Sequence, residues 1–371
     1  MPNIPAAVAP VEPTIEEQLL GREPVRLDEP AVQRFLAGRR VMVTGAGGSI
    51  GSELCRQIMR FCPETLIAVE RFENALFEID RELREKWVGE SVEPVIADVT
   101  DKHRINDVFA DHRPQVVLHA AAHKHVPMME RHPGEAVKNN VFGTQNVAEA
   151  SAEFGVEALV FISTDKAVRP TSVMGATKRV GEMIVCAGDG PRTSVVRFGN
   201  VLGSNGSVVP IFQRQIDAGG PVTVTHPDMR RFFMTIPEAA QLVLQAGTIG
   251  QGGEIFVLEM GEPVRILDLA EAMIRRAGLV PGSDIRIKFS GIRPGEKLEE
   301  ELAEDDEPAL PTRCEKIRVL RSNGVEPASV EKHLATLRQV TNAPASEVVA
   351  ALRSAVATYQ HRQDTPMRLA A

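Results

Sequence analysis

The sequence predicts an α/β protein built on a doubly wound parallel sheet, with a smaller substrate-binding region toward the C-terminus. Short apolar, β-branched runs alternate with longer stretches of helical periodicity, which is the pattern of strands buried on both faces of a parallel sheet. A glycine-rich loop directly follows the first run. Right-handed crossovers would wind such units into a Rossmann-type sheet. The predicted strands are 40–44, 65–69, 92–97, 115–119, 158–162 and 193–198, and the predicted helices are 51–61, 73–87, 101–111, 133–154 and 173–187.

The same pattern divides the chain into four parts. They are an aperiodic tail expected to be disordered, a Rossmann domain, a substrate-binding region interleaved with that domain, and a C-terminal extension of strand and helix. The third part is rich in glycine, proline and arginine, and the fourth holds two amphipathic helices. In chain order the four parts are 1–18, 19–200, 201–310 and 311–371. The short strands expected in the third part lie near 222–225, 254–258 and 284–288, and the two helices of the fourth are 328–339 and 345–361.

Composition narrows the functional classes. The 371 residues are 43% hydrophobic and 25% charged, as in an ordinary globular protein. No apolar run approaches the roughly 20 residues of a membrane-spanning helix, and the start does not resemble a signal peptide, so we expect a cytoplasmic protein without a membrane span. The net charge of -8 argues against a nucleic-acid partner. The 4 cysteines have neither metal nor disulfide spacing, which fits a reducing compartment.

The loop after the first predicted strand has the spacing of a phosphate-binding turn. Gly45, Gly48 and Gly51 allow a tight turn in which backbone N–H groups approach a pyrophosphate. Ser49 and Ile50 open the helix that follows, so the positive end of that helix faces the same ligand. With a strand before it and a helix after it, the loop predicts a dinucleotide cofactor.

An acidic residue at the end of the second predicted strand favours NAD as that cofactor. Glu70 is placed to accept hydrogen bonds from an adenosine ribose, and its carboxylate would repel the 2′-phosphate of NADP. Arg71, the next residue, could bind that phosphate, so NADP stays open. After the third predicted strand, Asp98 and Val99 are expected to hold the adenine edge.

A histidine-rich loop follows the fourth predicted strand. The residues His119, His123 and His125 suggest a metal site at first sight, yet the spacing is poor for one and we expect no metal. Small side chains suit a loop pressed against a nicotinamide ring, and Lys124 could meet the sugar or phosphate of a substrate. The small residues are Ala120, Ala121 and Ala122.

Polar residues that can move protons follow the fifth predicted strand. Thr164, Asp165 and Lys166 come directly after it, and Met174 and Lys178 lie on the next helix. A threonine, a carboxyl group and an amine can supply an anchor, an acid and a base. Taken alone, the three are also an ordinary polar strand end. A methionine can neither give nor take a proton.

Five motifs, in this order, carry a family resemblance: TGAGGSIGSEL, HAAAHKHVPMME, ISTDKAVRPTSVMGATKR, RFGNVLGSNGSVVPIF and RPGEK. Over roughly residues 19–305 the chain resembles the polysaccharide-biosynthesis branch of the extended short-chain dehydrogenases/reductases. It is most similar to the CapD-like UDP-N-acetylglucosamine 4,6-dehydratases, and among them to the catalytic domain of the long, membrane-anchored members. Most short-chain dehydrogenases have Tyr-x-x-x-Lys where this chain has Met174 to Lys178, and methionine there is typical of the long-form group.

The resemblance implies an internal redox cycle on a UDP-sugar, with tightly bound NAD. Asp165 would be the acid to the C6 hydroxyl and Lys166 the base at C5, with Thr164 holding the C4 oxygen. Lys178 would bind the nicotinamide ribose. A neutral Lys166 near pH 7 requires its pKa to be lowered by burial or by a nearby cation.

The resemblance also implies contacts to the nucleotide sugar and a homodimer or higher oligomer. The diphosphate would be held near the start of a helix and by arginines, and the uridine ribose by a glutamate. These residues are Asn200, Val209, Pro210, Arg230, Arg231, Arg293 and Glu296. Helices 133–154 and 173–187 would form the four-helix dimer interface, unless their apolar residues are buried against the sheet alone.

Two other functions stay open at this level. An epimerase of the same fold, acting at C4 or C5, would bind the same substrates without loss of water. A protein without catalytic activity that senses NAD(H) would explain Met174, but it would not need the substrate-binding arginines.

Overall fold

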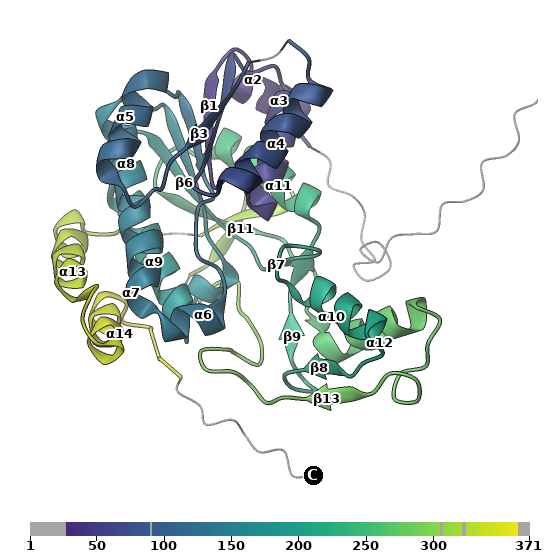
Figure 1. The fold of residues 1–371 in the computed structure, drawn as a ribbon. Coiled ribbons are helices and arrows are strands. Elements are labelled where there is room, and N and C mark those ends of the chain that lie inside the picture. Colours follow the sequence, from purple (N-terminus) through teal and green to yellow (C-terminus); the bar gives the residue numbers. More distant parts are fainter. Residues whose placement is uncertain (1–26, 90, 305–306, 321–323, 363–371) are drawn as a thin grey trace, which may run out of the picture.

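A sheet of nine strands forms the centre of the fold (Figure 1). The structure is a computed structural model that describes residues 27–89, 91–304, 307–320 and 324–362. Within these residues the strand order is β14-β15-β11-β6-β5-β4-β1-β2-β3. The strands from β3 to β11 are parallel, and β15 is antiparallel to β11 and β14. The bounds are β1 Arg40–Thr44, β2 Thr65–Glu70, β3 Val92–Ile96, β4 Val116–His119, β5 Ala158–Ile162, β6 Arg192–Arg197, β11 Glu254–Leu258, β14 Ala309–Pro311 and β15 Ile317–Leu320.

The order of the sheet reverses between β1 and β4. Strand β1 pairs with β2 on one side and with β4 on the other, and Thr44 lies beside His119 in the register. In a doubly wound sheet, ligands bind at the carboxyl ends of the strands where the order reverses. The predicted fold class is therefore confirmed, and the phosphate loop and the histidine-rich loop lie at the expected edge.

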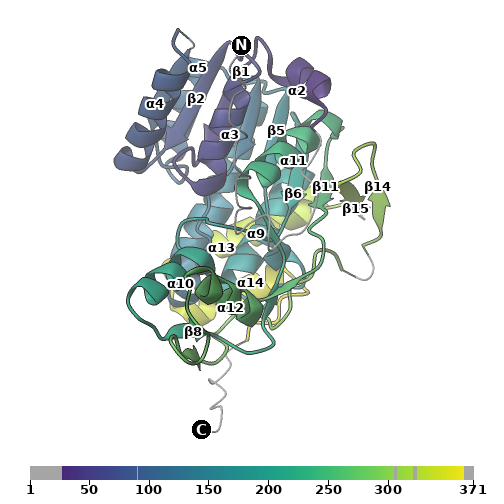
Figure 2. The ribbon, with the colours of Figure 1, turned by 90° about the vertical axis from the view of Figure 1, so that its right-hand side faces the viewer.

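Helices cover both faces of the sheet (Figures 1 and 2). Apolar side chains of α2, α3, α4 and α11 pack in one core cluster, and those of α5, α8 and α9 pack in another on the opposite face. The predicted helix 133–154 consists of α7, a π-helical turn and α8 in succession. The bounds are α2 Glu29–Leu36, α3 Ser49–Met59, α4 Glu73–Lys86, α5 Lys102–His112, α7 Pro133–Ala136, η1 Val137–Phe142, α8 Gly143–Glu153, α9 Val173–Ala187 and α11 Ile236–Ile249.

A smaller region with its own apolar core lies below the carboxyl ends of the strands in Figure 1. The chain enters it after β6, returns to the main sheet for α11 and β11, and then enters it again, which makes the two parts interleaved. The domain boundaries themselves stay a prediction. The elements of this region are β7 Asn200–Val201, α10 Val208–Asp217, β8 Val222–Val224, β9 Arg230–Arg231, β10 Phe233–Met234, β12 Val264–Arg265, α12 Ile266–Arg276 and β13 Ile287–Phe289.

The C-terminal extension adds two strands to the sheet and then two helices, α13 (Pro327–Val340) and α14 (Ala345–Ala355). The first helix lies where the sequence predicts it. The second is predicted to reach residue 361, but it ends at Ala355, because Val356 is extended and a turn follows in which Tyr359 N–H donates to the Val356 carbonyl. Gln360 N–H donates to the carbonyl of Pro170 at 2.9 Å. The predicted disordered tail at 1–18 lies outside the described residues.

The C-terminal helices lie on the helices that were expected to form a dimer interface. Leu334 of α13 and Leu352 of α14 share one apolar cluster with Val141 of the π-helical turn and with Val180 and Ile184 of α9. All five side chains are buried within one chain. A homodimer stays a prediction, and any dimer formed by this face must also accommodate α13 and α14.

Candidate functional site

The phosphate loop has the geometry that its spacing predicts. Gly45 follows β1 with a φ of +70°, and a Cβ atom there would come within 2.8 Å of the Ala121 backbone. A Cβ on Gly51 would lie 2.0 Å from the Gly45 carbonyl oxygen. Only glycine fits at either position. Helix α3 begins at Ser49, and no side chain caps its first N–H groups, so these remain available to an anion.

A pocket of about 310 Å³ opens beside this loop. Glu70 and Arg71 lie in its wall, as do Val99 and the predicted alanines of the histidine-rich loop. One Glu70 carboxylate oxygen accepts the Gly47 N–H at 3.1 Å, and the other accepts the Arg71 N–H at 2.9 Å. Glu70 therefore orders the loop as well as facing the pocket. The pocket residues are Gly45, Gly47, Gly48, Val69, Glu70, Arg71, Phe72, Ala75, Ala97, Val99, Ala120, Ala121, Ala122, His123, Asn139 and Asn205.

The glycine cradle, the uncapped helix start and the acidic wall fit the diphosphate and adenosine of a dinucleotide. Asp98 lies just outside the wall, where it accepts the Thr100 N–H at 2.9 Å and pairs with Arg71 at 3.5 Å. Burial raises the pKa of Asp98, but the hydrogen bonds from Thr100 and the charge of Arg71 outweigh burial and lower it overall. Asp98 is thus an anion that holds Arg71 at the pocket.

Several residues of this pocket were not predicted from the sequence. Asn205 is the clearest, because it reaches the pocket from the smaller region and its N–H donates to Ser49 Oγ at 3.1 Å. Nothing in the local spacing of a loop between β7 and α10 points to such a contact. Gly47 did carry a signal, since it lies in the glycine-rich run: a Cβ there would meet Ala75 at 2.5 Å.

The predicted proton-moving residues form a connected cluster at the carboxyl end of β5. Thr164 Oγ1 donates to Asp165 Oδ1 at 2.9 Å, and Lys166 Nζ donates to the same oxygen at 2.9 Å. Asn200, which begins β7, accepts a second hydrogen bond from Lys166 Nζ at 3.1 Å. Asp165 is fully buried, and its Oδ2 has no hydrogen-bond partner among the described residues.

The charge state of Lys166 differs from the expectation. Burial lowers the pKa of this amine, but the carboxylates of Asp165 and Glu300 outweigh burial and raise it above its usual range. Lys166 is therefore a cation in this structure, whereas a neutral base near pH 7 would require a lowered pKa. The sequence gives no indication of Glu300, a carboxylate that reaches Lys166 from a distant segment.

Lys178 has the lowered pKa that was expected for Lys166. Burial lowers the pKa of Lys178 to about 7, partly offset by Glu182. Its ammonium donates to the Ile162 carbonyl at 2.5 Å and lies 3.9 Å from the centre of the Phe161 ring. Lys178 thus lies beneath the end of β5 and can gain or lose a proton near neutral pH.

His119 has a structural place between two threonines. Its Nδ1 lies 2.6 Å from Thr44 Oγ1 and its Nε2 lies 3.0 Å from Thr144 Oγ1. Burial and the charge of Lys178 lower its pKa to about 3, so the ring is neutral. Because Thr144 Oγ1 donates its own proton to the Asn140 carbonyl, it accepts from Nε2–H, which leaves Nδ1 to accept from Thr44. Within the described residues no three His, Cys, Asp or Glu side chains gather to hold a metal ion.

Met174 lies in an apolar environment. Its side chain is 3% exposed and belongs to the cluster that also contains Val126, Met129 and Tyr359. Tyr359, the chain's single tyrosine, is buried, and its hydroxyl has no hydrogen-bond partner among the described residues.

The C-terminal residues join the start of α9 to the RPGEK loop. Glu130 accepts the Val173 N–H at 2.7 Å with one carboxylate oxygen and pairs with His361 at 2.7 Å through the other. Gly295 N–H donates to the carbonyl of Arg362 at 3.1 Å. No sequence motif points to this junction, which fixes the first turn of the helix that carries Lys178.

The predicted substrate residues are spread more widely. Val209 and Pro210 lie half-buried in the first turn of α10, and Lys124 is exposed. Arg293 and Glu296, predicted to bind different parts of the substrate, pair with each other at 2.6 Å. The substrate contacts of these residues stay predictions.

The two neighbouring arginines of β9 differ from each other. Arg230 is exposed and lies 3.4 Å from Glu299. Arg231 is buried, and its guanidinium donates to the carbonyls of Lys297 and Leu298 at 2.9 and 3.2 Å. Arg231 therefore fixes a neighbouring segment, and its contact to a substrate phosphate stays a prediction.

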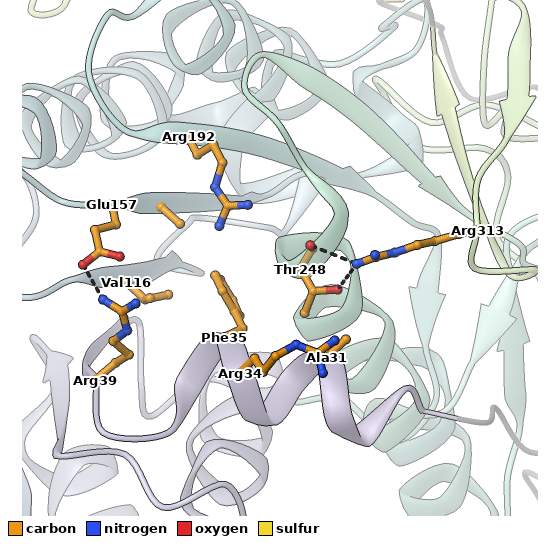
Figure 3. A pocket seen from close by; sticks show the side chains of 10 residues that line it. Ala31, Arg34, Phe35, Arg39, Val116, Glu157, Arg192, Thr248 and Arg313 are labelled. Atoms are coloured by element: carbon orange, nitrogen blue, oxygen red, sulfur yellow. Dashed lines mark hydrogen bonds and ion pairs between the residues drawn. The ribbon is translucent and has the colours of Figure 1, made fainter.

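A second pocket, of about 280 Å³, lies at the opposite edge of the sheet, where β4, β5 and β6 begin (Figure 3). Three of its four arginines, all except Arg34, have structural partners within the described residues. Arg192 donates to the Gly250 carbonyl at 2.9 Å and Arg313 to the Thr248 carbonyl at 3.2 Å, both at the negative end of α11, and Arg39 pairs with Glu157. We assign this pocket to packing at the end of α11.

Comparison with known proteins places the chain in a family. The sequence pattern of the family described as "Polysaccharide biosynthesis protein" matches residues 41–322. The capsular polysaccharide biosynthesis protein CapD of Staphylococcus aureus is 57% identical over 297 residues, which are 78% of this chain and 49% of that protein. The chain thus spans about half the length of this relative.

Other relatives carry the names of two enzymes. A UDP-N-acetylglucosamine 4,6-dehydratase (inverting) of Campylobacter jejuni is 34% identical over 281 residues, 74% of this chain and 80% of that protein. A UDP-glucose 4-epimerase of Rickettsia canadensis is 35% identical over 284 residues, 73% of this chain and 79% of that protein.

A solved structure agrees with this placement. The X-ray structure of Pen from Bacillus thuringiensis superimposes with a TM-score of 0.71 at 34% identity, covering 78% of this chain and 89% of that one. Within the described residues, no helix combines the length and the apolar character that crossing a bilayer requires. The chain belongs to the polysaccharide biosynthesis protein family, on the fold of the extended short-chain dehydrogenases/reductases.

Proposed function

We propose that this chain is an NAD-dependent 4,6-dehydratase that converts UDP-N-acetylglucosamine to UDP-4-keto-6-deoxy-N-acetylhexosamine and water, for surface polysaccharide or glycoprotein glycan synthesis. The observation that carries the proposal is the hydrogen-bonded cluster of Thr164, Asp165 and Lys166, next to Lys178 and at the same edge of the sheet as the dinucleotide pocket. This edge brings an anchor, an acid and an amine together where a sugar would meet a cofactor.

NAD fits the pocket, and when bound it would take a hydride from C4 of the sugar and return one to C6. The glycine cradle and the start of α3 would hold its diphosphate, and Glu70 would accept hydrogen bonds from its adenosine ribose. Lys178 would bind the nicotinamide ribose. Since each cycle restores the cofactor, the protein should need no added NAD.

The residues of the cluster can accept and donate each proton that the reaction moves. Thr164 Oγ1 already donates to Asp165 Oδ1, so the proton released from O4 has a path through Thr164 to Asp165. Asp165 would then protonate the C6 hydroxyl, which leaves as water. Lys166 would take the C5 proton and later return one to C5.

The resting charge of Lys166 requires a change before it can act as this base. Protonation of Asp165 removes one of its counter-charges, and a bound sugar displaces water from its surroundings. Both changes lower the pKa of the amine, and its proton would pass to water as the substrate binds, since the Lys166 side chain is partly exposed. We therefore propose that Lys166 becomes a base only in the complex with the substrate.

The second candidate is a C4 epimerase, which the relatives of that name favour. Such an enzyme needs no base at C5, and it needs an acid/base group where this chain has the buried Met174. Lys166 and Met174 therefore favour the dehydratase.

The proposal is tested by incubating the purified chain with UDP-N-acetylglucosamine, without added NAD. The mass of the nucleotide sugar is then measured by mass spectrometry. A dehydratase gives a product lighter by one water, and an Asp165→Asn variant should not. An epimerase gives a product of unchanged mass that separates by chromatography. A protein that only senses NAD(H) leaves all UDP- and dTDP-sugars unchanged.

A further inference from the structure

A second buried carboxylate faces Lys166 from a distant part of the chain. Glu300 lies beyond the RPGEK motif, and its side chain is 3% exposed. Its Oε1 lies 3.6 Å from Lys166 Nζ and 3.9 Å from Arg231 Nε. Lys166 therefore lies between two carboxylates, since Asp165 is on its other side at 2.9 Å.

The surrounding contacts hold Glu300 in this place. Arg231 fixes the backbone just before it by binding the carbonyls of Lys297 and Leu298. Lys297 Nζ donates to the Val168 carbonyl at 2.8 Å, which ties the segment to the loop after Lys166. On the far side of Glu300, Glu301 pairs with Arg169. A segment tied at three points around one residue gives that residue a defined position.

The hydrogen-bonding capacity of the buried carboxylates in this cluster is only partly satisfied. Asp165 Oδ2 and Glu300 Oε2 have no hydrogen-bond partner among the described residues. A buried carboxylate oxygen without a partner is costly, and such groups are kept mainly where chemistry needs them. The charged groups that face the Lys166 ammonium are Asp165, Glu300 and Arg231.

We propose that Glu300 is a positioning residue of the catalytic cluster: it is the second counter-charge of Lys166 and the carboxylate that remains beside the amine when Asp165 carries a proton. The inference rests on the proposed function, in which Asp165 must be protonated to release water. In that state the Asp165 charge is gone, and Glu300 alone balances Lys166 against Arg231. Glu300 thus sets the pH at which the amine becomes free to act at C5.

A direct measurement is the titration of Lys166, followed by NMR on protein with isotope-labelled lysine and assigned with a Lys166→Arg variant. An opposite charge within about 4–6 Å moves a pKa by about 1–3 units. In Glu300→Gln the carboxylate is lost, so the titration midpoint of Lys166 should fall by about that amount. Glu300→Asp should keep most of the wild-type value. Glu299→Gln changes an exposed neighbour and serves as the matched control.

The second measurement is deuterium exchange at C5 of UDP-N-acetylglucosamine as a function of pH. The acidic limb of this profile should move to lower pH in Glu300→Gln and stay in place in Glu299→Gln. An unchanged Lys166 midpoint in a folded Glu300→Gln protein overturns the inference, whatever the activity. A lowered midpoint in a protein that never exchanges the C5 proton supports the counter-charge and overturns the proposed function instead.

Discussion

The Lys166 ammonium lies 2.9 Å from Oδ1 of Asp165, the residue next to it in the chain. The side chain of Asp165 is fully buried and that of Lys166 is 19% exposed, so the pair is poorly screened by water. The charge of each member therefore acts strongly on the other across this short contact. The acid and the base of the proposed reaction are therefore one coupled group.

Removing the amine tests the proposed role of Lys166 as the base. Lys166→Ala should retain the cofactor, because Lys166 does not line the dinucleotide pocket, and it should lose turnover by about 10²–10⁴-fold, the range that one general acid or base contributes. Cofactor content and the rate of water loss are the measurements, with the exposed Lys288→Ala as control. Normal turnover in Lys166→Ala would show that another group is the base.

A tyrosine at position 174 should not improve the enzyme. Met174 is buried in an apolar cluster, where a phenol would need both more space and a hydrogen-bond partner. We expect Met174→Tyr to lower the thermal unfolding midpoint and to leave the dehydration rate equal or lower. Tyr359→Phe should leave the rate unchanged, since we assign Tyr359 to packing. A large rate increase in Met174→Tyr would indicate that the site is an ordinary short-chain dehydrogenase site that has lost its catalytic tyrosine.

Lys178 is expected to lower the free energy of unfolding of the chain near neutral pH. Its pKa is about 7 in the folded chain, against about 10.4 when unfolded, so the folded state binds its proton less tightly. The cost is full below about pH 7 and fades as pH rises toward the unfolded value. The pKa difference corresponds to about 4 kcal/mol at pH 7, so Lys178→Met should raise the thermal unfolding midpoint at that pH, and it should lose turnover.

The pH series separates this effect from a general gain in packing. The stabilisation by Lys178→Met should be much smaller near pH 10 than at pH 7, and Lys288→Met should show none at any pH. A stabilisation of equal size at pH 7 and pH 10 would contradict the assignment of a lowered pKa to Lys178.

A buried ion pair near the site should make the stability of the folded chain sensitive to acid. Arg197 and Glu182 lie 2.7 Å apart with almost no exposure, and Ser163 Oγ donates to Glu182 at 2.6 Å. Burial raises the pKa of Glu182, but Arg197 outweighs burial and lowers it to about 2. The contribution of Glu182 to stability is therefore present above about pH 4.5 and lost as pH falls toward 2.

Breaking this pair should be costly. Glu182→Gln leaves Arg197 with one fewer counter-charge in a buried place, and we expect a loss of about 3–5 kcal/mol in unfolding free energy by denaturant titration at pH 7. The exposed Glu331→Gln should change it by less than about 0.5 kcal/mol. An equal, small effect in both variants would mean that the pair adds nothing to stability.

Local patterns predicted much of the fold. The strand expected at 254–258 has those bounds, and the glycine spacing located the cradle at Gly45 and Gly51 correctly. These features depend on residues close together in the sequence. The strand expected near 284–288 lies at Ile287–Phe289 instead, in the smaller region where the apolar pattern is weak.

The parts that the sequence could not predict depend on contacts between distant segments. Glu300 lies far along the chain from Lys166, and no motif includes both residues. The charge of Lys166 follows from their contact, so it could not be inferred before the segments were placed. Asn205 and His361 reach their sites in the same way, from a loop and from the C-terminal end.

The proposed dehydratase removes water from UDP-N-acetylglucosamine through an internal redox cycle. The most direct test is one incubation of the purified chain with that substrate in heavy water, without added cofactor, followed by mass spectrometry of the nucleotide sugar. We expect the product to have lost one water and gained one deuterium at C5. An unchanged mass from protein that contains NAD would contradict this expectation, and deuterium gained without loss of water would indicate an epimerase at C5.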